Sequence, residues 1–359
     1  MKKIYFLLMF VFLFAVNSTA QISGKFSGYM FGDYYYNVER DTGIANIPDV
    51  AIGGARDLNG FEFRRIYLTY DNEISSNFSA RVRLEADQIA STSDGKIGVF
   101  IKDAYVVWKN VFEGSNLIFG MQPSPSFEVS ESFWGFRFIE KTIMDLRGIT
   151  PSRDIAIALR GRFDKEEKLR YWVMFGNGSG VRPETDKYKR FYSWLQYSPS
   201  KDFTFTLYAD YNFRPKITSP IAPGTTVPNS DYTVTAFAGY ANKDVYSFGI
   251  EAFQNFRENG FVENGQLKTL MKTGVSVSAT YFFSKQYSLM GRYDYFNPAM
   301  NNDAVKRQRN LFITSFNYKP VDKLILSPNL IIETYQTTET GRVIKPSVTG
   351  RFTVNYTFL

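Results

Sequence analysis

The charged side chains with the clearest pattern alternate with apolar residues in the segment 78–87. Arg81, Arg83, Glu85 and Asp87 occupy every second position, and Val, Leu and Ala stand between them. Because successive side chains of a β-strand point to opposite faces, a strand here has one apolar and one charged face. Guanidinium groups in such a row can bind carboxylate or phosphate, and carboxylates can pair with them. The row therefore predicts ion binding or ion selection rather than a reaction.

The residue types that most often catalyse reactions are missing from the sequence. The 359 residues include no Cys and no His, which excludes disulfide bonds, zinc–thiolate sites and catalysis by thiolate or imidazole. The glycine-rich segment 177–180 lacks the Lys-Ser/Thr of a phosphate-binding P-loop, and no acidic cluster has the spacing of a calcium loop. We expect no enzyme activity, no cofactor and no bound metal ion.

The two-residue period of the charged row recurs along most of the chain. Segments 203–212, 287–295 and 348–358 show it clearly. Aromatic residues make up 17% of the chain, yet the mean hydropathy is only −0.24. After the N-terminal twenty residues, no apolar run reaches the roughly 18 residues of a membrane-spanning helix. Alternation of this kind is typical of a β-barrel in lipid, although a soluble β-sandwich also alternates.

Short and long connectors alternate between the segments that show the two-residue period. Short polar turns are expected at 72–77, 109–115, 164–168, 198–202, 242–244, 284–286 and 319–323. Longer connectors are expected at 39–60, 89–96, 123–151, 177–189, 214–231, 257–270, 298–308 and 336–346. Counting around them predicts an all-β fold, a closed antiparallel transmembrane β-barrel of about sixteen strands. Short turns would face the periplasm, together with both termini, and long loops the outside.

The first twenty residues have the features of a secretory signal peptide. Lys2 and Lys3 precede an apolar run at 4–16, and small residues stand at Ser18 and Ala20. We expect cleavage after Ala20, which leaves residues 21–359 as one barrel domain.

The side chains predicted to face the barrel interior carry both signs of charge. Those we expect to line a pore and set its selectivity are Arg65, Arg81, Arg83, Glu85, Arg160, Arg162 and Arg292. Rings of basic residues select anions, whereas pairing across strands would cancel the charges. The net charge of +7 is modest for this length, and we expect no nucleic-acid partner.

Six short segments, in order along the chain, resemble the phosphate-selective porins O and P. They are FEFRRIYLTY at 61–70, KDAYVVW at 102–108, FGMQP at 119–123, SRDIA at 152–156, FGNGSG at 175–180 and RYDYFNP at 292–298. The resemblance implies a sixteen-stranded barrel, usually a homotrimer, in the outer membrane of a Gram-negative bacterium. It also implies that Phe358 is part of the aromatic signal read by the barrel-assembly machinery, although the chain continues to Leu359.

The connector after the predicted fifth strand is too long for a plain hairpin loop. In porins such as those it resembles, this loop folds into the barrel and narrows the pore, and we assign that role to residues 122–150. An external surface loop is the alternative. The residues expected to act at the constriction are Trp134, Arg137, Lys141 and Arg147.

The sequence thus predicts a porin that passes small hydrophilic solutes and ions and contacts outer-membrane lipid. An anion or phosphate preference is left open by the mixed charges. The alternative function is an outer-membrane barrel with a structural or binding role, such as an adhesin or anchor, and no open pore.

Overall fold

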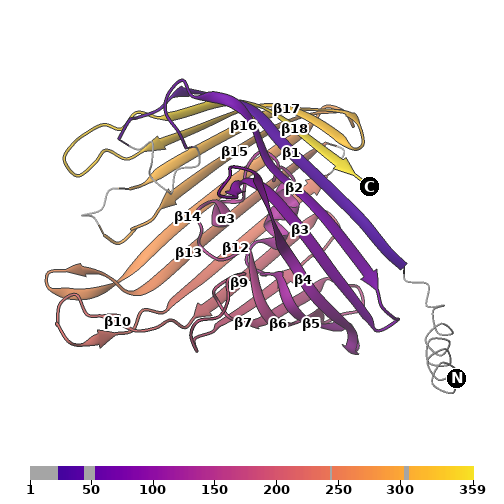
Figure 1. Cartoon of the computed structure of the whole chain (residues 1–359), viewed down its shortest axis with the longest axis horizontal. Coiled ribbons are helices and arrows are strands. Elements are labelled where there is room, and N and C mark those ends of the chain that lie inside the picture. The colour runs from indigo at the N-terminus through magenta and orange to yellow at the C-terminus, as the bar shows by residue number, and fades with distance from the viewer. Residues whose placement is uncertain (1–22, 44–52, 243–244, 303–306) are drawn as a thin grey trace, which may run out of the picture.

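Sixteen antiparallel strands form one closed barrel (Figure 1). The computed structural model describes residues 23–43, 53–242, 245–302 and 307–359. The predicted signal peptide lies outside the described residues, as do parts of the connectors expected at 39–60, 242–244 and 298–308. Strands β1 and β18 pair along ten or more residues, from Gly28 opposite Phe358 to Glu39 opposite Val348, and so close the sheet. The predicted fold class and strand number are confirmed.

The barrel strands follow one another along the chain, and each pairs with its neighbours in sequence. Their bounds are β1 Ser23–Glu39, β2 Asn59–Glu73, β3 Phe78–Ser91, β4 Ile97–Phe112, β5 Ser115–Pro123, β6 Arg153–Arg162, β7 Leu169–Gly176, β8 Arg190–Tyr197, β9 Phe203–Asn212, β12 Asp231–Asn242, β13 Tyr246–Glu263, β14 Gln266–Phe282, β15 Tyr287–Asn297, β16 Arg309–Val321, β17 Leu324–Tyr335 and β18 Ser347–Phe358. Outside the barrel sheet lie the small hairpin β10 Ile217–Thr218 and β11 Thr226–Val227 and two short helices, α2 Glu128–Trp134 and α3 Ile143–Leu146.

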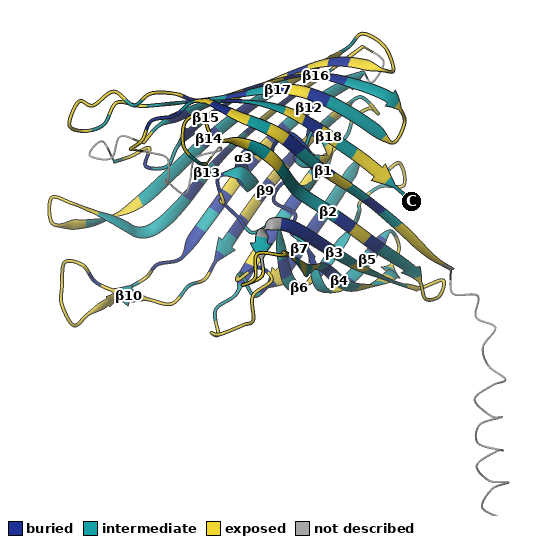
Figure 2. Cartoon of the chain, turned by 45° about the horizontal axis from the view of Figure 1, so that its top comes forward, coloured by how far each residue is buried: buried dark blue, intermediate teal, exposed yellow. Residues whose placement is uncertain are grey.

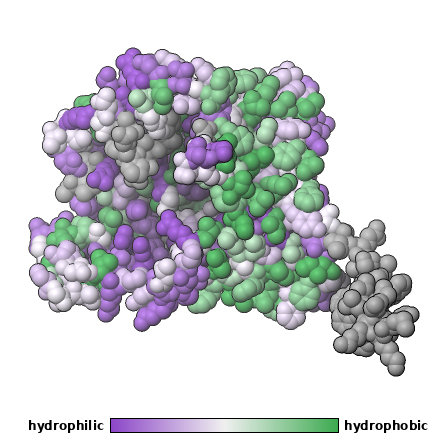
Figure 3. All heavy atoms as spheres, in the orientation of Figure 1, coloured by the Kyte–Doolittle hydropathy of each residue, from purple (hydrophilic) through white to green (hydrophobic). Residues whose placement is uncertain are grey.

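The two faces of the sheet differ in polarity, as the alternation predicts. On β9, Phe203, Phe205 and Leu207 are exposed on the outer face, while Thr206 and Asp210 are buried on the inner face. Exposed and buried residues alternate in this way along many strands (Figure 2). Figure 3 shows hydrophobic side chains gathered on the outside of the strands and hydrophilic ones at the long-loop end. An apolar outer face with every backbone group paired within the sheet is the arrangement that a bilayer requires of strands.

Connector lengths confirm the predicted alternation of short turns and long loops, with two corrections. The connector expected at 89–96 is only residues 92–96, because β3 continues to Ser91. The segment 257–270 was expected to be a loop, but β13 and β14 continue through it as a projecting hairpin. Its turn is formed by Asn264 and Gly265, which have φ values of 48° and 72°. Consecutive residues with positive φ form a tight two-residue hairpin turn, for which Asn-Gly is the preferred pair. That dipeptide was the available sequence signal.

Two of the irregularities in strand pairing turn additional charged side chains of β2 and β4 into the barrel. The register between β1 and β2 shifts at Arg64, and that between β3 and β4 shifts at Lys102. Each shift leaves one residue without a cross-strand partner, Arg64 on β2 and Lys102 on β4, which is a β-bulge. As a result, Arg64 and Arg65 both point inward, as do Lys102 and Asp103.

Among the described residues, none of the helices is long and apolar enough to cross a membrane.

Candidate functional site: the inner loop and the charged wall

The connector after β5, residues 124–152, folds into the barrel instead of projecting from it, as predicted. It carries α2, which packs against β12 and β13, and α3, which packs against β14 (Figure 1). The Ser124 hydroxyl donates a hydrogen bond of 2.6 Å to the Pro151 carbonyl and closes the base of the loop. We call residues 124–152 the inner loop.

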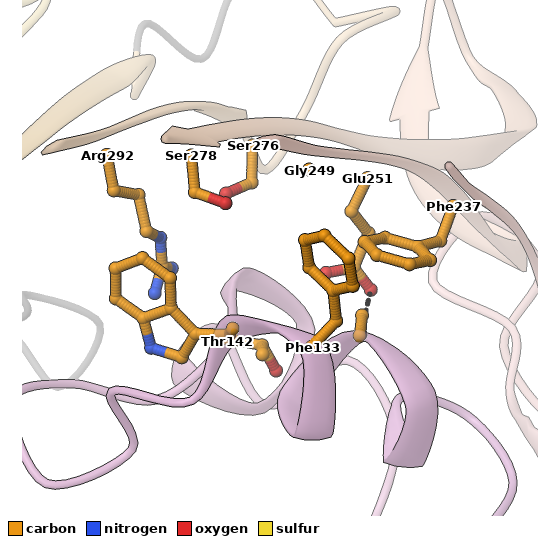
Figure 4. A pocket seen from close by; sticks show the side chains of 10 residues that line it. Phe133, Thr142, Phe237, Gly249, Glu251, Ser276, Ser278 and Arg292 are labelled. Carbon is orange, nitrogen blue, oxygen red and sulfur yellow. Dashed lines mark hydrogen bonds between the residues drawn. The ribbon is translucent and has the colours of Figure 1, made fainter. Parts of the chain in front are cut away.

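A phenylalanine of α2 fits a wall surface formed by small residues. The Phe133 ring packs edge-on against Phe237, with 5.3 Å between ring centroids. A Cβ added at Gly239 would lie 2.6 Å from the Phe133 ring, and one at Gly249 would lie 3.1 Å from it. Ser276, on β14, lines the same small cavity (Figure 4). The absence of side chains at the two glycines therefore lets the inner loop approach the wall.

We expect Gly239→Val to displace Phe133, because its side chain would occupy the space of the ring. Overpacking of this kind costs roughly 1–3 kcal/mol. Resistance to urea, measured with the protein in lipid vesicles, should fall, and trypsin should cut the inner loop faster. The double variant Gly239→Val/Phe133→Ala should recover part of the loss. A double variant no better than Gly239→Val alone would show that Phe133 is not what Gly239 accommodates.

Two arginines of the wall hold the backbone of the inner loop. Arg64 pairs with Asp33 and donates a hydrogen bond of 2.9 Å to the carbonyl of Ile139. Arg292 donates to Asp294 at 2.8 Å and to the Lys141 carbonyl at 2.5 Å. Since carbonyl groups inside a barrel need donors, these contacts both satisfy the loop backbone and fix its position.

Two predicted constriction residues, Trp134 and Arg147, also help to fix the position of the inner loop. The Trp134 indole donates 3.0 Å to the Glu140 carbonyl, and Arg292 lies over its ring at 4.9 Å. The Arg147 side chain is 0% exposed and pairs with Glu333 at 2.7 Å. The structure thus places Trp134, Arg147 and Arg292 in the contact between loop and wall, where their side chains do not face open water.

Apolar packing fills a large part of the interior at the level of the inner loop. One cluster joins Phe127, Ile143 and Met144 of the loop to wall residues such as Trp172 and Tyr192. A second cluster joins Trp134, Phe138 and Ile139 to wall residues that include Leu311 and Ile331. Through these clusters and its two helices the inner loop contacts β5–β9 and β12–β17, and it reaches β1 and β2 at Phe31 and Tyr67. The charged part of the wall lies on β2–β4.

The charged wall on β2–β4 is a network of ion pairs. Glu85 lies 2.9 Å from both Arg65 and Lys102. Next to them, Arg83 lies 3.3 Å from Asp103, which also pairs with Arg153. Arginine and carboxylate in such close pairs neutralise much of each other's field, so this wall is polar but nearly balanced in charge.

The inner loop presents its own charges toward that wall. Arg137 lies between Glu131, at 3.3 Å, and Asp145, at 3.6 Å. Burial raises the pKa of Glu131, and the positive charges of Arg137, Arg153 and Lys102 oppose the rise. The loop triad of Glu131, Arg137 and Asp145 thus stands close to the charged wall, and this is the polar region beside the inner loop.

Nearer the short turns, the barrel interior holds a cavity of about 710 Å³. The inner loop forms one side of it, through residues of α2 and the segment that follows. The charged residues lining it are Arg160, Arg170, Lys201, Lys285, Lys319, Glu128 and Asp202. Five basic and two acidic side chains make this cavity more positive than the charged wall. We call it the short-turn vestibule.

The other predicted pore-lining residues lie inside the barrel, in ion pairs. Arg81 pairs with Asp71 at 2.6 Å, and Arg162 pairs with Glu167 at 2.5 Å. Arg160 lies 3.0 Å from Glu128 and over the Trp172 ring. Their positions are those that alternation predicts, and their effect on ion selection stays a prediction.

Sequence reasoning missed Arg64, Lys102 and Arg153. The first two lie on bulges, where a strict two-residue period assigns them to the outer face. Arg153 is the first residue of β6, directly after the inner loop, and it pairs with Asp103 of β4. The signal available in the sequence was a pair of adjacent charged residues, Arg64-Arg65 and Lys102-Asp103, inside otherwise alternating strands.

A closed sixteen-stranded barrel with a loop folded inward is the fold of the outer-membrane porins. The outer membrane channel DcaP of Acinetobacter baumannii has a TM-score of 0.69 and 15% sequence identity, with 95% of this chain and 99% of that chain covered. An anion-selective porin from Comamonas acidovorans has a TM-score of 0.65 and 12% identity, with 94% and 100% covered.

OmpF of Salmonella typhi, solved in complex with daunomycin, has a TM-score of 0.64 and 12% identity, with 93% of this chain and 97% of that chain covered. At such identities the likeness shows the fold alone. The sequence matches no protein-family model and no curated protein.

Proposed function

We propose that this chain is a porin of a Gram-negative outer membrane and passes small hydrophilic solutes and ions by diffusion. The observation that carries the proposal is the polar region where the loop triad meets the charged wall, inside a barrel whose outer face is apolar. Side chains of this kind give water and ions a hydrogen-bonding path, while the apolar packing of the inner loop limits its width. Catalysis forms no part of the proposed role.

Uptake by proteoliposomes tests the proposal. Vesicles containing the folded protein should swell when transferred into solutions of small amino acids or pentoses, and swell less in larger oligosaccharides. Vesicles without protein, prepared in the same way, are the control. A folded barrel that gives no swelling with any of these solutes would support the structural or binding role instead.

A preference for anions belongs to the same proposal. Charges beside the inner loop are nearly balanced, whereas the short-turn vestibule has more basic than acidic side chains. Membership of the phosphate-selective O and P family is proposed only on the ordered segments that resemble it. A homotrimer and insertion by the barrel-assembly machinery are proposed on the same resemblance. Removal of residues 1–20 is proposed on the basic, apolar and small residues at the N-terminus.

We expect Arg137→Ala to shift the reversal potential across a KCl gradient toward cation selectivity, because it leaves Glu131 and Asp145 without their shared cation. A unit charge about 4 Å from an ion is worth about 1 kcal/mol in water, so the permeability ratio should change by up to about fivefold. Arg81→Ala, at a half-buried ion pair with Asp71, should shift it in the same direction by less. Arg137→Lys is the matched control and should stay near the parent value. Should neither alanine variant move the reversal potential, these arginines do not line the ion path.

A further inference from the structure

The short-turn vestibule brings aromatic and basic side chains together around one cavity. Its volume of about 710 Å³ falls in the roughly 300–1,000 Å³ range of small-molecule sites. One side is aromatic and belongs to the inner loop, and the rim is basic and belongs to the ends of the wall strands. Most porin-like interiors need only polar side chains to stay wet, so an aromatic side in a basic cavity calls for a specific explanation.

The aromatic side of the vestibule is centred on Phe136. Its ring meets Trp134 edge-on at 5.4 Å and Phe138 at 5.8 Å, and the residue is only half-buried. Phe133 and Ile325 line the same cavity. Phe136 follows Gly135, which ends α2 with a φ of 71°, and both residues line the vestibule. An incoming ring therefore has an aromatic surface to stack on.

The five basic side chains of the rim differ in whether they form ion pairs. Arg160 pairs with Glu128, and Arg170 pairs with Glu167. Lys319 pairs with Asp322 at 3.0 Å. Within the described part of the chain, by contrast, Lys201 and Lys285 are exposed and make no ion pair. Ammonium groups of this kind are free to meet a carboxylate from solution.

We infer that the short-turn vestibule binds aromatic carboxylates, with the ring against Phe136 and the carboxylate toward Lys201 and Lys285. The inference rests on the proposed function, since a permeating solute would reach this cavity after passing the inner loop. Aliphatic and inorganic anions can use only the charged half of the vestibule, and neutral aromatic compounds only the other half. A ligand that carries both groups uses the two together.

Binding of benzoate to the purified full chain in detergent tests the inference without depending on an open channel. Saturation-transfer NMR should give benzoate a dissociation constant at least about threefold lower than that of acetate, which lacks the ring, or benzamide, which lacks the charge. Phe136→Ser should weaken benzoate by about threefold to tenfold and leave acetate unchanged. Lys201→Gln/Lys285→Gln should weaken benzoate and acetate alike, by up to about fivefold per charge.

The matched control is Lys165→Gln. It removes one lysine from another short turn of the same rim but does not line the vestibule. Benzoate affinity should be unchanged in it. Equal affinity for benzoate, acetate and benzamide, or loss of benzoate binding in Lys165→Gln but not in Phe136→Ser, would overturn the inference. Because the measurement needs no current, a protein that binds benzoate but never conducts would contradict the proposed function and leave this site standing.

Discussion

Arg292→Ala is expected to loosen the inner loop and to enlarge the pore. The side chain is 2% exposed, and its loss leaves Asp294 buried without its partner and the Lys141 carbonyl without its donor. Removing one member of a buried ion pair costs roughly 3–5 kcal/mol. We expect a lower urea midpoint in lipid vesicles, noisier single-channel currents with larger steps, and swelling of proteoliposomes in larger sugars than the parent admits.

Two variants separate loop release from a general loss of stability. Arg56→Ala removes an exposed arginine 3.9 Å from Glu39, a pair worth at most about 1 kcal/mol, and should change neither stability nor current. Arg292→Ala/Asp294→Ala removes both buried charges, so it should recover stability while the step size stays large. Unchanged conductance in both Arg292 variants would mean that this arginine does not hold the loop in the pore.

Leu207→Arg should destabilise the barrel in lipid by roughly 2–4 kcal/mol, as expected for arginine near the bilayer midplane. Leu207 lies midway along β9 and is 61% exposed on the apolar outer face. Unfolding in urea from vesicles of defined thickness measures the change.

The matched control is Gln196→Arg, on the neighbouring strand β8. Gln196 points inward and lines the short-turn vestibule, so an added arginine there meets water and not lipid. Its effect on stability should be within about 1 kcal/mol, because surface substitutions away from packed groups usually are. Equal losses for the two variants would contradict the assignment of inner and outer faces.

Much of the fold could be predicted because the strands of a barrel in lipid alternate apolar outer residues with polar inner residues. Arg81, Arg83 and Glu85 alternate with apolar residues, and the structure places all three on the inner face. The turn lengths then give the strand count, since an antiparallel barrel alternates between its two rims. The alternation and the turn lengths each depend on residues close together in the chain, so both can be read from a single sequence.

What could not be predicted depends on residues far apart in the chain. Arg292 contacts the backbone of Lys141, and Arg147 pairs with Glu333. Only the docked loop brings these groups together. Alternation placed Arg292 in the pore, and the length of the connector placed Arg147 at the constriction, but neither signal predicts these contacts. The bulge at Arg64 is missed for another reason, since one extra residue changes the face without changing the composition of the strand.

Single-channel recording of the purified full chain in planar bilayers tests most directly whether water and ions pass beside the inner loop. In KCl the parent protein should give discrete, repeated current steps, and Arg292→Ala should give larger ones from the same preparation. A folded, lipid-inserted barrel that carries no current in any of several salts would contradict an open path along the charged wall.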